Sequence, residues 1–542
     1  MRHMASAVTL VLVVLSCGVP DEPAPRLIED GAPSQGGTVV IGLLSDVQSW
    51  NPYLAEDAGT HNLLALIYPS LAIEQADYRL HPPSFEPALA TSWSWSEDHL
   101  ELILKLEPAA RWADGVPITA HDVVYTWTAQ TSPEVDWIGA YAKDSIASVE
   151  AIGDHTVKVV FNRLYPYQMM DLNDGLILPA HVFGKIPLDQ WRTTDWIDHV
   201  VAGGPFALTD HTPRQDITLE RNPNYFRAGR PFLDRLVFRI ATSDRALMTQ
   251  LLAGELDFLR SVPPSDAERV RNTDGIKLVI YDDRSYTHIC WNTTRPGLSD
   301  PQVRRALSMA IDRETLIDVV YRGFARLGAG PVLSSFWAFN RNLEPLPFDP
   351  TAARELLADS GWRDHDGDEI VDREGKQLTI ELMAPAENEL RQDIAILVQE
   401  DLRRIGVRAE PRFVEWGAMT AAMYSGDFEA LVNLWEEPTQ VDLGEIWHSP
   451  PPDQPTFNFG RWADPEVDDL LVQASQLPMF GDQKPHLDRI QEIIVASQPY
   501  TFLVENVRLT AHTHRIRGAQ INAATPYFNI DEWYVETTVD AE

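Results

Sequence analysis

The clearest pattern of apolar and polar positions lies between residues 100 and 129, where a period of two gives way to a helical period. Leucine recurs at every second position of the segment 102–106, which is typical of a strand with one buried face. Asp114-Gly115 predicts a turn, because glycine accepts backbone angles that other residues avoid. Thr119 and Asp122 have the spacing of a capping box, so we expect a helix to begin there and to pack against the strand.

A second strand–helix–strand pattern follows between residues 234 and 259. We expect a strand over Leu236–Ile240, then a helix that Asp244 caps and that runs through Leu252. Another strand begins at Leu256. Such a unit with a short return is an α/β crossover.

The rest of the chain continues the alternation of strands and helices. We expect strands at Thr38–Leu44, Ser285–Asn292 and Phe428–Trp435, and a helix through Leu63 to Leu71. Aspartate followed by proline predicts further helix starts, because the aspartate caps free amides and proline suits the first helical position. These pairs are 300–301, 349–350 and 464–465.

Length and charge limit the class of protein. A chain of 542 residues is too long for one core, and two or three domains are expected. The formal charge of −36 argues against nucleic acid as a partner, since phosphate binding draws on basic patches. Two cysteines cannot build a disulfide framework. No internal repeat or linker divides residues 38–542, which suggests domains that interleave along the chain.

The N-terminus has the pattern of a secretory signal. Arg2 precedes the apolar run Val8–Leu15, which is too short to span a bilayer permanently. The following Ser16-Cys17 completes a segment that resembles a lipobox, so we predict a signal peptide over 1–17 and a lipid on Cys17. An ordinary signal with an incidental cysteine is the alternative. Residues 18–37 are rich in proline and acidic side chains and read as a solvated tether.

Motifs of catalysis and of cofactor binding are absent from the sequence. It contains no P-loop, no dinucleotide-binding glycine pattern, no H-E-x-x-H and no G-x-S-x-G. We therefore expect neither an enzyme nor a cofactor. The acidic run Asp364–Asp372 lacks the glycine and glutamate that a calcium loop needs at its sixth and twelfth positions. We interpret it as a polar turn and expect no metal there, with calcium as the alternative.

Aromatic and acidic side chains come together between residues 414 and 447. Trp435 ends a predicted strand and is followed by Glu436 and Glu437, at the kind of sheet edge where ligands bind. Trp416 precedes the same helix–strand unit. An aromatic wall beside an acid suits a cationic amine. The alternative is that the tryptophans pack in the core and the glutamates are solvated.

The segment Pro87–Trp127 also carries a family resemblance. It contains P-A-L-A-T-S-W and W-A-D-G-V-P-I-T-A-H-D-V-V-Y-T-W, which resemble the signature of family 5 solute-binding proteins, the receptors of peptide and nickel ABC importers. Similar matches are G-G-P-F-A-L from Gly203, R-N-P-N-Y-F from Arg221, A-G-E-L-D-F from Ala253 and A-R-E-L-L-A-D-S-G-W from Ala353.

The resemblance implies an α/β, two-lobed periplasmic-binding-protein fold of the class II or cluster C type, with an extra inserted domain. A discontinuous domain I would carry domain II as an insertion, and domain III would form the other lobe. The boundaries that we predict are 38–70, 200–280 and 506–542 for domain I, 71–199 for domain II and 281–505 for domain III. The lobes would close around a ligand by a hinge.

The resemblance also implies a set of ligand-binding residues. In peptide-binding relatives an acid after a strand-terminal tryptophan holds the peptide amine, and Glu436, Glu437 or Asp442 would take that role here. The remaining residues that the resemblance implies are Trp435 and Trp416, the segment 56–60 with Glu56, Ala58 and Thr60, and the aromatic pair Tyr286 and His288.

These observations favour a lipid-anchored binding protein that delivers a short peptide to an ABC importer. It would be a monomer on the periplasmic or extracellular face, with permease subunits in the membrane as partners and no nucleic acid. A nickel or other metal chelate, haem and an oligosaccharide are alternative ligands. Alternatives from other classes are a peptide or pheromone receptor without transport, and a secreted hydrolase with paired carboxylates.

Overall fold

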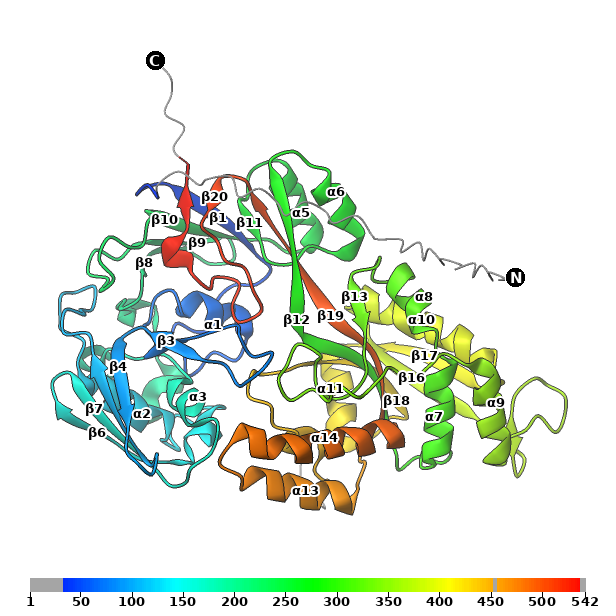
Figure 1. Cartoon of the computed structure of the whole chain (residues 1–542). Coiled ribbons are helices and arrows are strands. Elements are labelled where there is room, and N and C mark those ends of the chain that lie inside the picture. Colours follow the sequence, from blue (N-terminus) through cyan, green and yellow to red (C-terminus); the bar gives the residue numbers. More distant parts are fainter. Residues whose placement is uncertain (1–32, 452–455, 537–542) are drawn as a thin grey trace, which may run out of the picture. The chain divides into compact units, whose positions relative to one another are not determined.

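A computed structural model describes residues 33–451 and 456–536 of the chain (Figure 1). The predicted signal peptide, Cys17 and residues 18–32 of the predicted tether lie outside the described residues. The described helices and strands belong to one compact unit, which begins at Ser34. Among the described residues, none of the helices combines the length and the apolar character that a membrane crossing requires.

An 11-stranded mixed sheet organises most of this unit. Its order is β17 (Arg408–Val414), β16 (Thr379–Pro385), β18 (Ala430–Glu436), β12 (Ile276–Trp291), β19 (Tyr500–Thr513), β11 (Phe258–Leu259), β1 (Thr38–Leu43), β10 (Arg235–Ile240), β9 (Asp216–Arg221) and β8 (Phe206–Thr212), with β13 (Ala325–Leu327) pairing with β19.

Two long strands connect the two ends of the sheet. β12 has 16 residues and β19 has 14, and they pair antiparallel from Ile276↔Thr513 to Cys290↔Tyr500. Figure 1 shows both strands running from the group around β1 to the group around β18. We expected a strand only from Ser285. The observed strand begins at Ile276, in a half-exposed stretch whose apolar residues do not alternate regularly, and pairing with β19 supplies its hydrogen bonds.

The predicted crossover is confirmed, with one correction. β10 and β11 lie on either side of β1, both parallel to it, and α5 (Asp244–Leu252) connects them. Ser243, rather than Asp244, is the N-cap, since its hydroxyl accepts the Ala246 amide while its backbone is extended.

The opening strand–turn–helix pattern forms part of a separate four-stranded sheet. Its order is β4 (Ala90–Trp95), β5 (Glu101–Leu106), β7 (Thr156–Phe161) and β6 (Ile146–Gly153). The predicted capping box is present at the start of α2 (Ala120–Gln130). We expected α2 to pack on β5, but it packs mainly on β6 and β7. The reason is that β7 and β6 complete the sheet beside β5 and offer their face to the helix.

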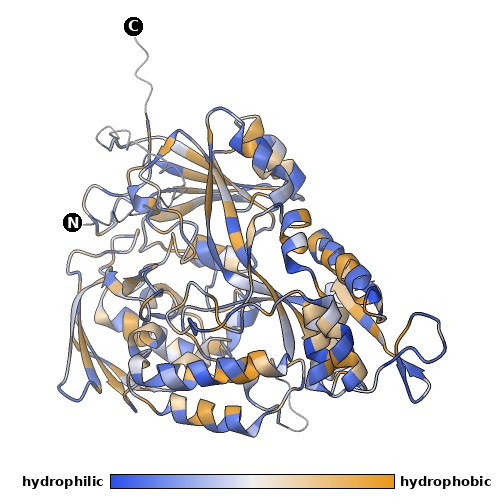
Figure 2. Cartoon of the chain, turned by 45° about the vertical axis from the view of Figure 1, so that its right-hand side comes forward, coloured by the Kyte–Doolittle hydropathy of each residue, from blue (hydrophilic) through white to orange (hydrophobic). Residues whose placement is uncertain are grey.

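The predicted starts of the helices agree with the structure better than their predicted ends. The three Asp-Pro pairs begin α7 (Pro301–Ala310), α9 (Pro350–Asp359) and α13 (Pro465–Ser475), and each aspartate accepts at least one backbone amide of the first turn. The helix that we predicted through Leu71 ends at Leu64. Ile67 and Leu71 are buried as expected, but they lie in the turns that follow the helix. Figure 2 shows orange and blue stripes along the helices, the pattern of amphipathic helices with one buried face.

The remaining elements are as follows. The helices are α1 (Ala58–Leu64), α3 (Gln168–Asn173), α4 (Ala180–Phe183), α6 (Ala267–Arg271), α7 (Pro301–Ala310), α8 (Arg313–Val319), α9 (Pro350–Asp359), α10 (Glu389–Arg403), α11 (Trp416–Ser425), α12 (Gly444–Trp447), α13 (Pro465–Ser475) and α14 (Phe480–Ser497). The short strands are β2 (Ala72–Glu74), β3 (Phe85–Pro87), β14 (Asp372–Arg373), β15 (Lys376–Gln377), β20 (Ile516–Arg517) and β21 (Tyr534–Val535).

The four-stranded sheet lies wholly within residues 71–199, whereas the large sheet draws its strands from 38–43, 206–291 and 325–513. The division into domains I, II and III at the stated boundaries stays a prediction.

Candidate functional site

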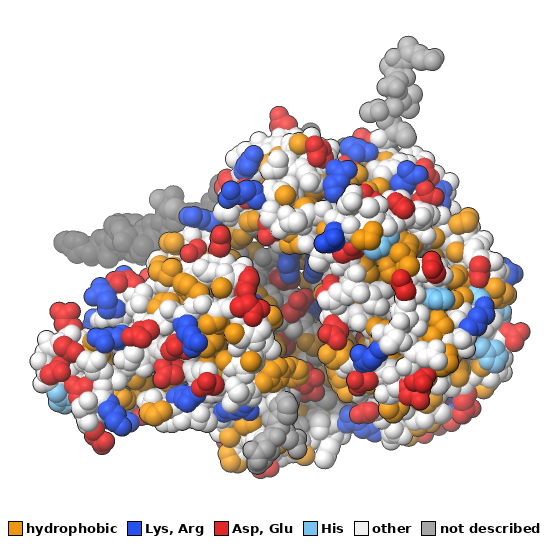
Figure 3. Space-filling model, turned by 180° about the vertical axis from the view of Figure 1, so that it is seen from behind, with side chains coloured by type: hydrophobic (Ala, Val, Ile, Leu, Met, Phe, Trp, Pro, Cys, Tyr) orange, Lys and Arg blue, Asp and Glu red, His pale blue; other side chains and the backbone are white. Residues whose placement is uncertain are grey.

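A cavity of about 580 Å³ is lined from all three predicted domains. Its volume is that of a small-molecule or short-peptide site. Its lining comes from the segments 52–74, 137–142, 170–176, 204–227, 438–440 and 524–531, with Ala88 and Arg284. Figure 3 shows a face that is hollowed near its centre, with acidic side chains and a few basic ones visible in the hollow.

Three carboxylates stand on one side of the cavity. Asp171 is buried on α3 and accepts the Tyr165 hydroxyl at 2.6 Å. Asp174 follows α3 and is exposed to the cavity. Glu74 ends β2 and also contributes to the wall. Desolvation by the surrounding wall raises the pKa of all three, that of Asp171 to about 6.

A buried lysine holds the backbone beneath these acids. The Lys143 ammonium donates to the carbonyl oxygens of Asp171 and Asp174, the second at 2.7 Å. Gln130 donates to the same Asp174 carbonyl at 2.8 Å. Burial lowers the pKa of Lys143 to about 8, against the attraction of the two aspartates. Lys143 therefore fixes the loop rather than projecting its charge into the cavity.

Two guanidinium groups reach the cavity from its other sides. Arg227 is paired with Asp531 at 3.3 Å and donates to the Pro87 carbonyl. Arg284 lies in the middle of β12, where the large cavity meets a smaller one of about 60 Å³. Within the described residues, the Arg284 side chain has no hydrogen bond or ion pair.

The loop after β18 closes the cavity against the four-stranded region. Thr439 donates its hydroxyl to Glu74 at 2.6 Å, and Tyr167 donates to the Val441 carbonyl at 3.2 Å. Pro438, Thr439 and Gln440 line the cavity directly. The predicted domain II and this loop of predicted domain III are therefore in contact.

The predicted residues Trp435, Glu436 and Glu437 lie just before this loop. Trp435 stacks on Phe459 with ring centroids 5.5 Å apart. Glu436 is exposed and lines the smaller cavity. Glu437 is part-buried, and burial with the charge of Glu445 raises its pKa to about 8.

Tyr286 and His288 are buried in β12, and neither lines the two cavities described above. The register of β12 and β18 sets Tyr286 opposite Trp435. The His288 ring stacks on Tyr500 at 4.2 Å, and neither ring nitrogen has a partner within the described residues. Burial lowers the pKa of His288 to about 3, so the imidazole is neutral at ordinary pH.

The remaining predicted residues are spread more widely. Trp416 is 46% exposed at the start of α11, where the Arg391 guanidinium lies 5.9 Å from its ring. Asp442 is exposed and accepts the Gly444 amide at 2.7 Å. No contact between Trp416 and Trp435 occurs within the described residues, so the structure does not bring the two tryptophans together.

The segment 56–60 reaches the site at one residue. Ala58 lines the smaller cavity together with Glu436 and Arg284. Glu56 is exposed, and its amide donates to Gln48. Thr60 is buried and its hydroxyl accepts the Gln48 amide at 3.2 Å.

Sequence reasoning missed most of the cavity wall. Glu74 ends β2, Asp171 lies within the short helix α3 and Asp174 follows that helix, so the only local signal is an acid near the end of an apolar run. Tyr527 of the C-terminal segment also lines the cavity. These residues come together only through the tertiary fold.

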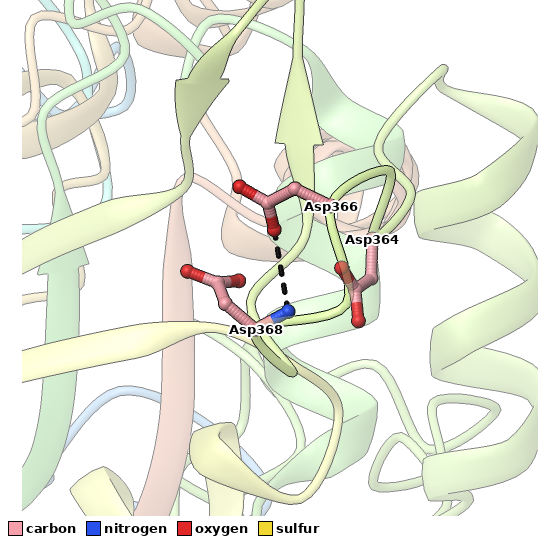
Figure 4. A group of neighbouring side chains, drawn as sticks. All are labelled: Asp364, Asp366 and Asp368. Carbon is pink, nitrogen blue, oxygen red and sulfur yellow. Dashed lines mark hydrogen bonds between the residues drawn. The ribbon is translucent and has the colours of Figure 1, made fainter.

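The acidic loop before β14 gathers three carboxylates. One oxygen from each of Asp364, Asp366 and Asp368 lies within 4.8 Å of the others (Figure 4). Backbone amides of the same loop already donate hydrogen bonds to these carboxylates. The Gly367 amide donates to Asp364 at 2.7 Å, and the Asp368 amide donates to Asp366 at 3.2 Å. Our interpretation as a polar turn rather than a calcium site stays a prediction.

The strand groups joined by β12 and β19, and the cavity lined from both, define a two-lobed α/β binding protein of the periplasmic-binding-protein type. The chain belongs to the bacterial extracellular solute-binding proteins, family 5, whose family model for the middle region matches residues 84–442. The resemblance in the sequence is thus confirmed.

The chain is similar over most of its length to proteins of that family. It is 28% identical over 513 residues to the oligopeptide-binding protein AppA of Bacillus subtilis, covering 93% of each chain. The structure of that protein in complex with a nonapeptide has a TM-score of 0.78 and covers 93% of this chain and all of its own.

Other similar proteins bind different ligands. The chain is 24% identical over 465 residues to heme-binding protein A of Haemophilus influenzae, covering 82% of this chain and 83% of that one. NikZ of Campylobacter jejuni, solved with Ni(L-His), shares the fold with a TM-score of 0.77 at 22% identity, covering 92% of this chain and 99% of its own.

Proposed function

We propose that this protein is the substrate-binding lipoprotein of an ABC importer and that it binds a short peptide in the cleft between its lobes. The observation that carries the proposal is the 580 Å³ cavity, whose wall comes from three separate parts of the chain. The similarity to a relative solved with a nonapeptide supports a peptide as the ligand. Such a receptor catalyses nothing and works as a monomer with permease subunits in the membrane.

We propose hinge closure about β12 and β19 as the binding motion. Both strands run between the two groups of the sheet, and their register shifts between Asp282 and Tyr286. A change of backbone angles at such an irregularity rotates one lobe against the other with little loss of packing. The contact of Thr439 with Glu74 is then made on closure.

The ligand-binding residues that we propose are those expected from the resemblance, together with the residues that line the cavity. Glu437 is the preferred partner of a ligand amine among Glu436, Glu437 and Asp442, because it is the most buried of the three. A bound ammonium would favour the charged carboxylate of Glu437 over the protonated form that burial stabilises. A partly desolvated pair of this kind contributes about 1.5–3 kcal/mol, or roughly 10- to 150-fold in affinity.

The test begins with mass spectrometry of the ligand that co-purifies with the full chain. Calorimetry then measures the affinity of a peptide of that sequence and of its N-acetylated form. The proteins compared are the wild type and the variants Glu436→Gln, Glu437→Gln and Asp442→Asn. Asp469→Asn is the control, because Asp469 is exposed on α13 and lines neither cavity. If acetylation weakens binding to the wild type but no variant loses affinity, the amine is held by another residue.

A metal chelate or haem is the second candidate ligand, favoured by the similarity to NikZ and to heme-binding protein A. If a metal chelate, haem or an oligosaccharide co-purifies with the protein, that compound and not a peptide is the ligand. Uptake of the identified ligand by cells with and without the gene separates an importer subunit from a receptor without transport. Turnover of the ligand would instead indicate a hydrolase.

A further inference from the structure

A small chamber adjoins the large cavity beside the two long strands. It has a volume of about 60 Å³ and shares part of its wall with the large cavity. The shared residues are Asn62, Arg284, Ala524 and Thr525. Sites for whole ligands have volumes of about 300–1,000 Å³, so this side chamber has room for one small group of a ligand that occupies the large cavity.

Three arginines line the side chamber, although the protein as a whole has a net charge of −36. Arg508 belongs to β19 and pairs with Asp283 of β12 at 2.6 Å. Arg260 and Arg284 are half-buried. Neither has an ion pair or a side-chain hydrogen bond in the part of the chain that the structure describes. Two guanidinium groups of the chamber therefore keep their hydrogen-bond donors free.

An irregularity in β12 places one of these arginines where the two spaces meet. The register of β12 with β19 shifts between Asp282 and Tyr286, so residues 283–285 have no regular partner in β19. Such an interruption of a ladder re-aims side chains that a regular strand would alternate between its faces. Arg284 lies in this stretch and lines both the large cavity and the side chamber.

The acids of the side chamber do not occupy these two arginines. Asp283 is already engaged by Arg508 and by the Ser285 hydroxyl. Glu436 is the other acid of the lining, and it forms no ion pair with another described residue. Two free guanidinium groups therefore share the chamber with one free carboxylate.

One acid of the large cavity also acts on the arginine at the junction. Burial raises the pKa of Glu74, and the charge of Arg284 partly offsets that rise. The Glu74 carboxylate already accepts the Thr439 hydroxyl, however, and it makes no ion pair with Arg284. An anionic group in the chamber would find N–H donors that the described acids leave open.

Two carboxamides add neutral donors to the same wall. The oxygen of Asn62 accepts the Thr525 hydroxyl at 3.3 Å, and the oxygen of Asn522 accepts the Ala524 amide at 2.9 Å. Both side chains line the chamber, and their amide nitrogens have no acceptor within residues 33–451 and 456–536. The chamber therefore offers free donors from two arginines and two asparagines.

We propose that the side chamber binds a carboxylate group of the ligand through Arg260 and Arg284. A planar guanidinium presents paired N–H groups that match the two oxygens of a carboxylate, and such charge-assisted hydrogen bonds are roughly twice as strong as neutral ones. The inference rests on the proposed function above and adds a chemical feature of its ligand. In a peptide the carboxylate is either the C-terminus or an acidic side chain, and the experiment separates these two sources.

The experiment is calorimetry of the full chain, freed of bound ligand, with trialanine, trialanine amide and Ala-Glu-Ala amide. Trialanine ends in a carboxylate, trialanine amide has none, and the third peptide carries its carboxylate only on a side chain. At least one of the two carboxylate peptides is expected to bind at least about tenfold more tightly than trialanine amide. The net charge of the protein acts against this result, because trialanine amide is the most positive of the three.

The variants are Arg260→Gln and Arg284→Gln, with Arg245→Gln as the matched control. Arg245 is exposed on α5 and lines neither the large cavity nor the side chamber. The measured quantity is the ratio of the affinities for the preferred carboxylate peptide and for trialanine amide, because a general loss of binding cancels in this ratio. Each of the first two variants should reduce the ratio about fivefold or more, and Arg245→Gln should retain it.

Melting temperatures establish that the variants fold. Arg284→Lys gives a second test, because lysine keeps the positive charge but loses the planar pair of donors. Its ratio should lie between those of the wild type and of Arg284→Gln.

The outcomes separate this inference from the proposed function. Equal affinity for all three peptides overturns the inference and leaves peptide binding in place. A preference for a carboxylate that both glutamine variants retain overturns the roles of Arg260 and Arg284. Binding of none of the peptides overturns the proposed function, and acetate then decides the inference alone. Compared with acetamide at equal ionic strength, acetate should raise the melting temperature of the wild type and of Arg245→Gln but not of Arg284→Gln. An equal effect on all three proteins overturns the inference.

Discussion

The hydroxyl of Thr439 donates a 2.6 Å hydrogen bond to the carboxylate of Glu74, although 365 positions separate them in the chain. Thr439 is 4% exposed, so water cannot easily replace the contact. It joins the end of β2 to the loop after β18, beside the cavity that both residues line.

We predict that Thr439→Val destabilises the closed form. The substitution leaves a part-buried carboxylate without its donor, which costs about 1–3 kcal/mol. X-ray scattering should give a larger radius of gyration for the variant without ligand, and ligand binding should weaken. Thr351→Val, at an exposed position on α9, is the control. Identical radii for wild type and variant would show that this contact does not hold the lobes together.

Stability should fall as pH rises because of Glu437. Burial and Glu445 raise its pKa to about 8 from the ordinary 4.5. Between those values the folded protein retains a proton that the unfolded chain has lost, so the free energy of unfolding decreases as pH increases from about 4.5 to about 8. Asp171, with a pKa raised to about 6, acts in the same direction at the lower end.

Melting temperatures from pH 5 to pH 8 measure this effect. Glu437→Gln should flatten the decline, whereas Glu410→Gln on the exposed side of β17 should leave it unchanged. A decline that is equally steep in the Glu437 variant would assign the proton to another group.

Lipidation is predicted at Cys17, which lies outside the described residues. Cys17→Ser should abolish the lipid attachment and release the protein from the membrane fraction. Labelling of cells with radioactive palmitate checks this, with Cys290→Ser as the control, because Cys290 is a buried thiol of β12. Undiminished labelling of the Cys17 variant would contradict the lipobox interpretation.

Calcium removal should not change stability. The backbone amides of Gly367, Asp368 and Ile370 already donate to the three carboxylates of the acidic loop before β14. The melting temperature with a chelator should equal that with added calcium. A drop of several degrees on chelation, absent in Asp366→Asn, would assign a metal to this loop.

Local patterns in the sequence determined much of the secondary structure of this protein. The capping box of Thr119 and Asp122 and the Asp-Pro helix starts depend on atoms within four residues, so they can be recognised without the fold. The motif from Pro87 to Trp127 likewise indicated the family, which the family model confirms.

Only the tertiary structure decided what surrounds the cavity. Asp174, Arg284 and Tyr527 lie on three distant segments, and no periodicity relates them. Trp416 and Trp435 both flank one helix–strand unit in the sequence, yet one lies exposed on α11 and the other stacks on Phe459. The direction of a side chain at the end of an element depends on what packs beside it, and that comes from residues hundreds of positions away.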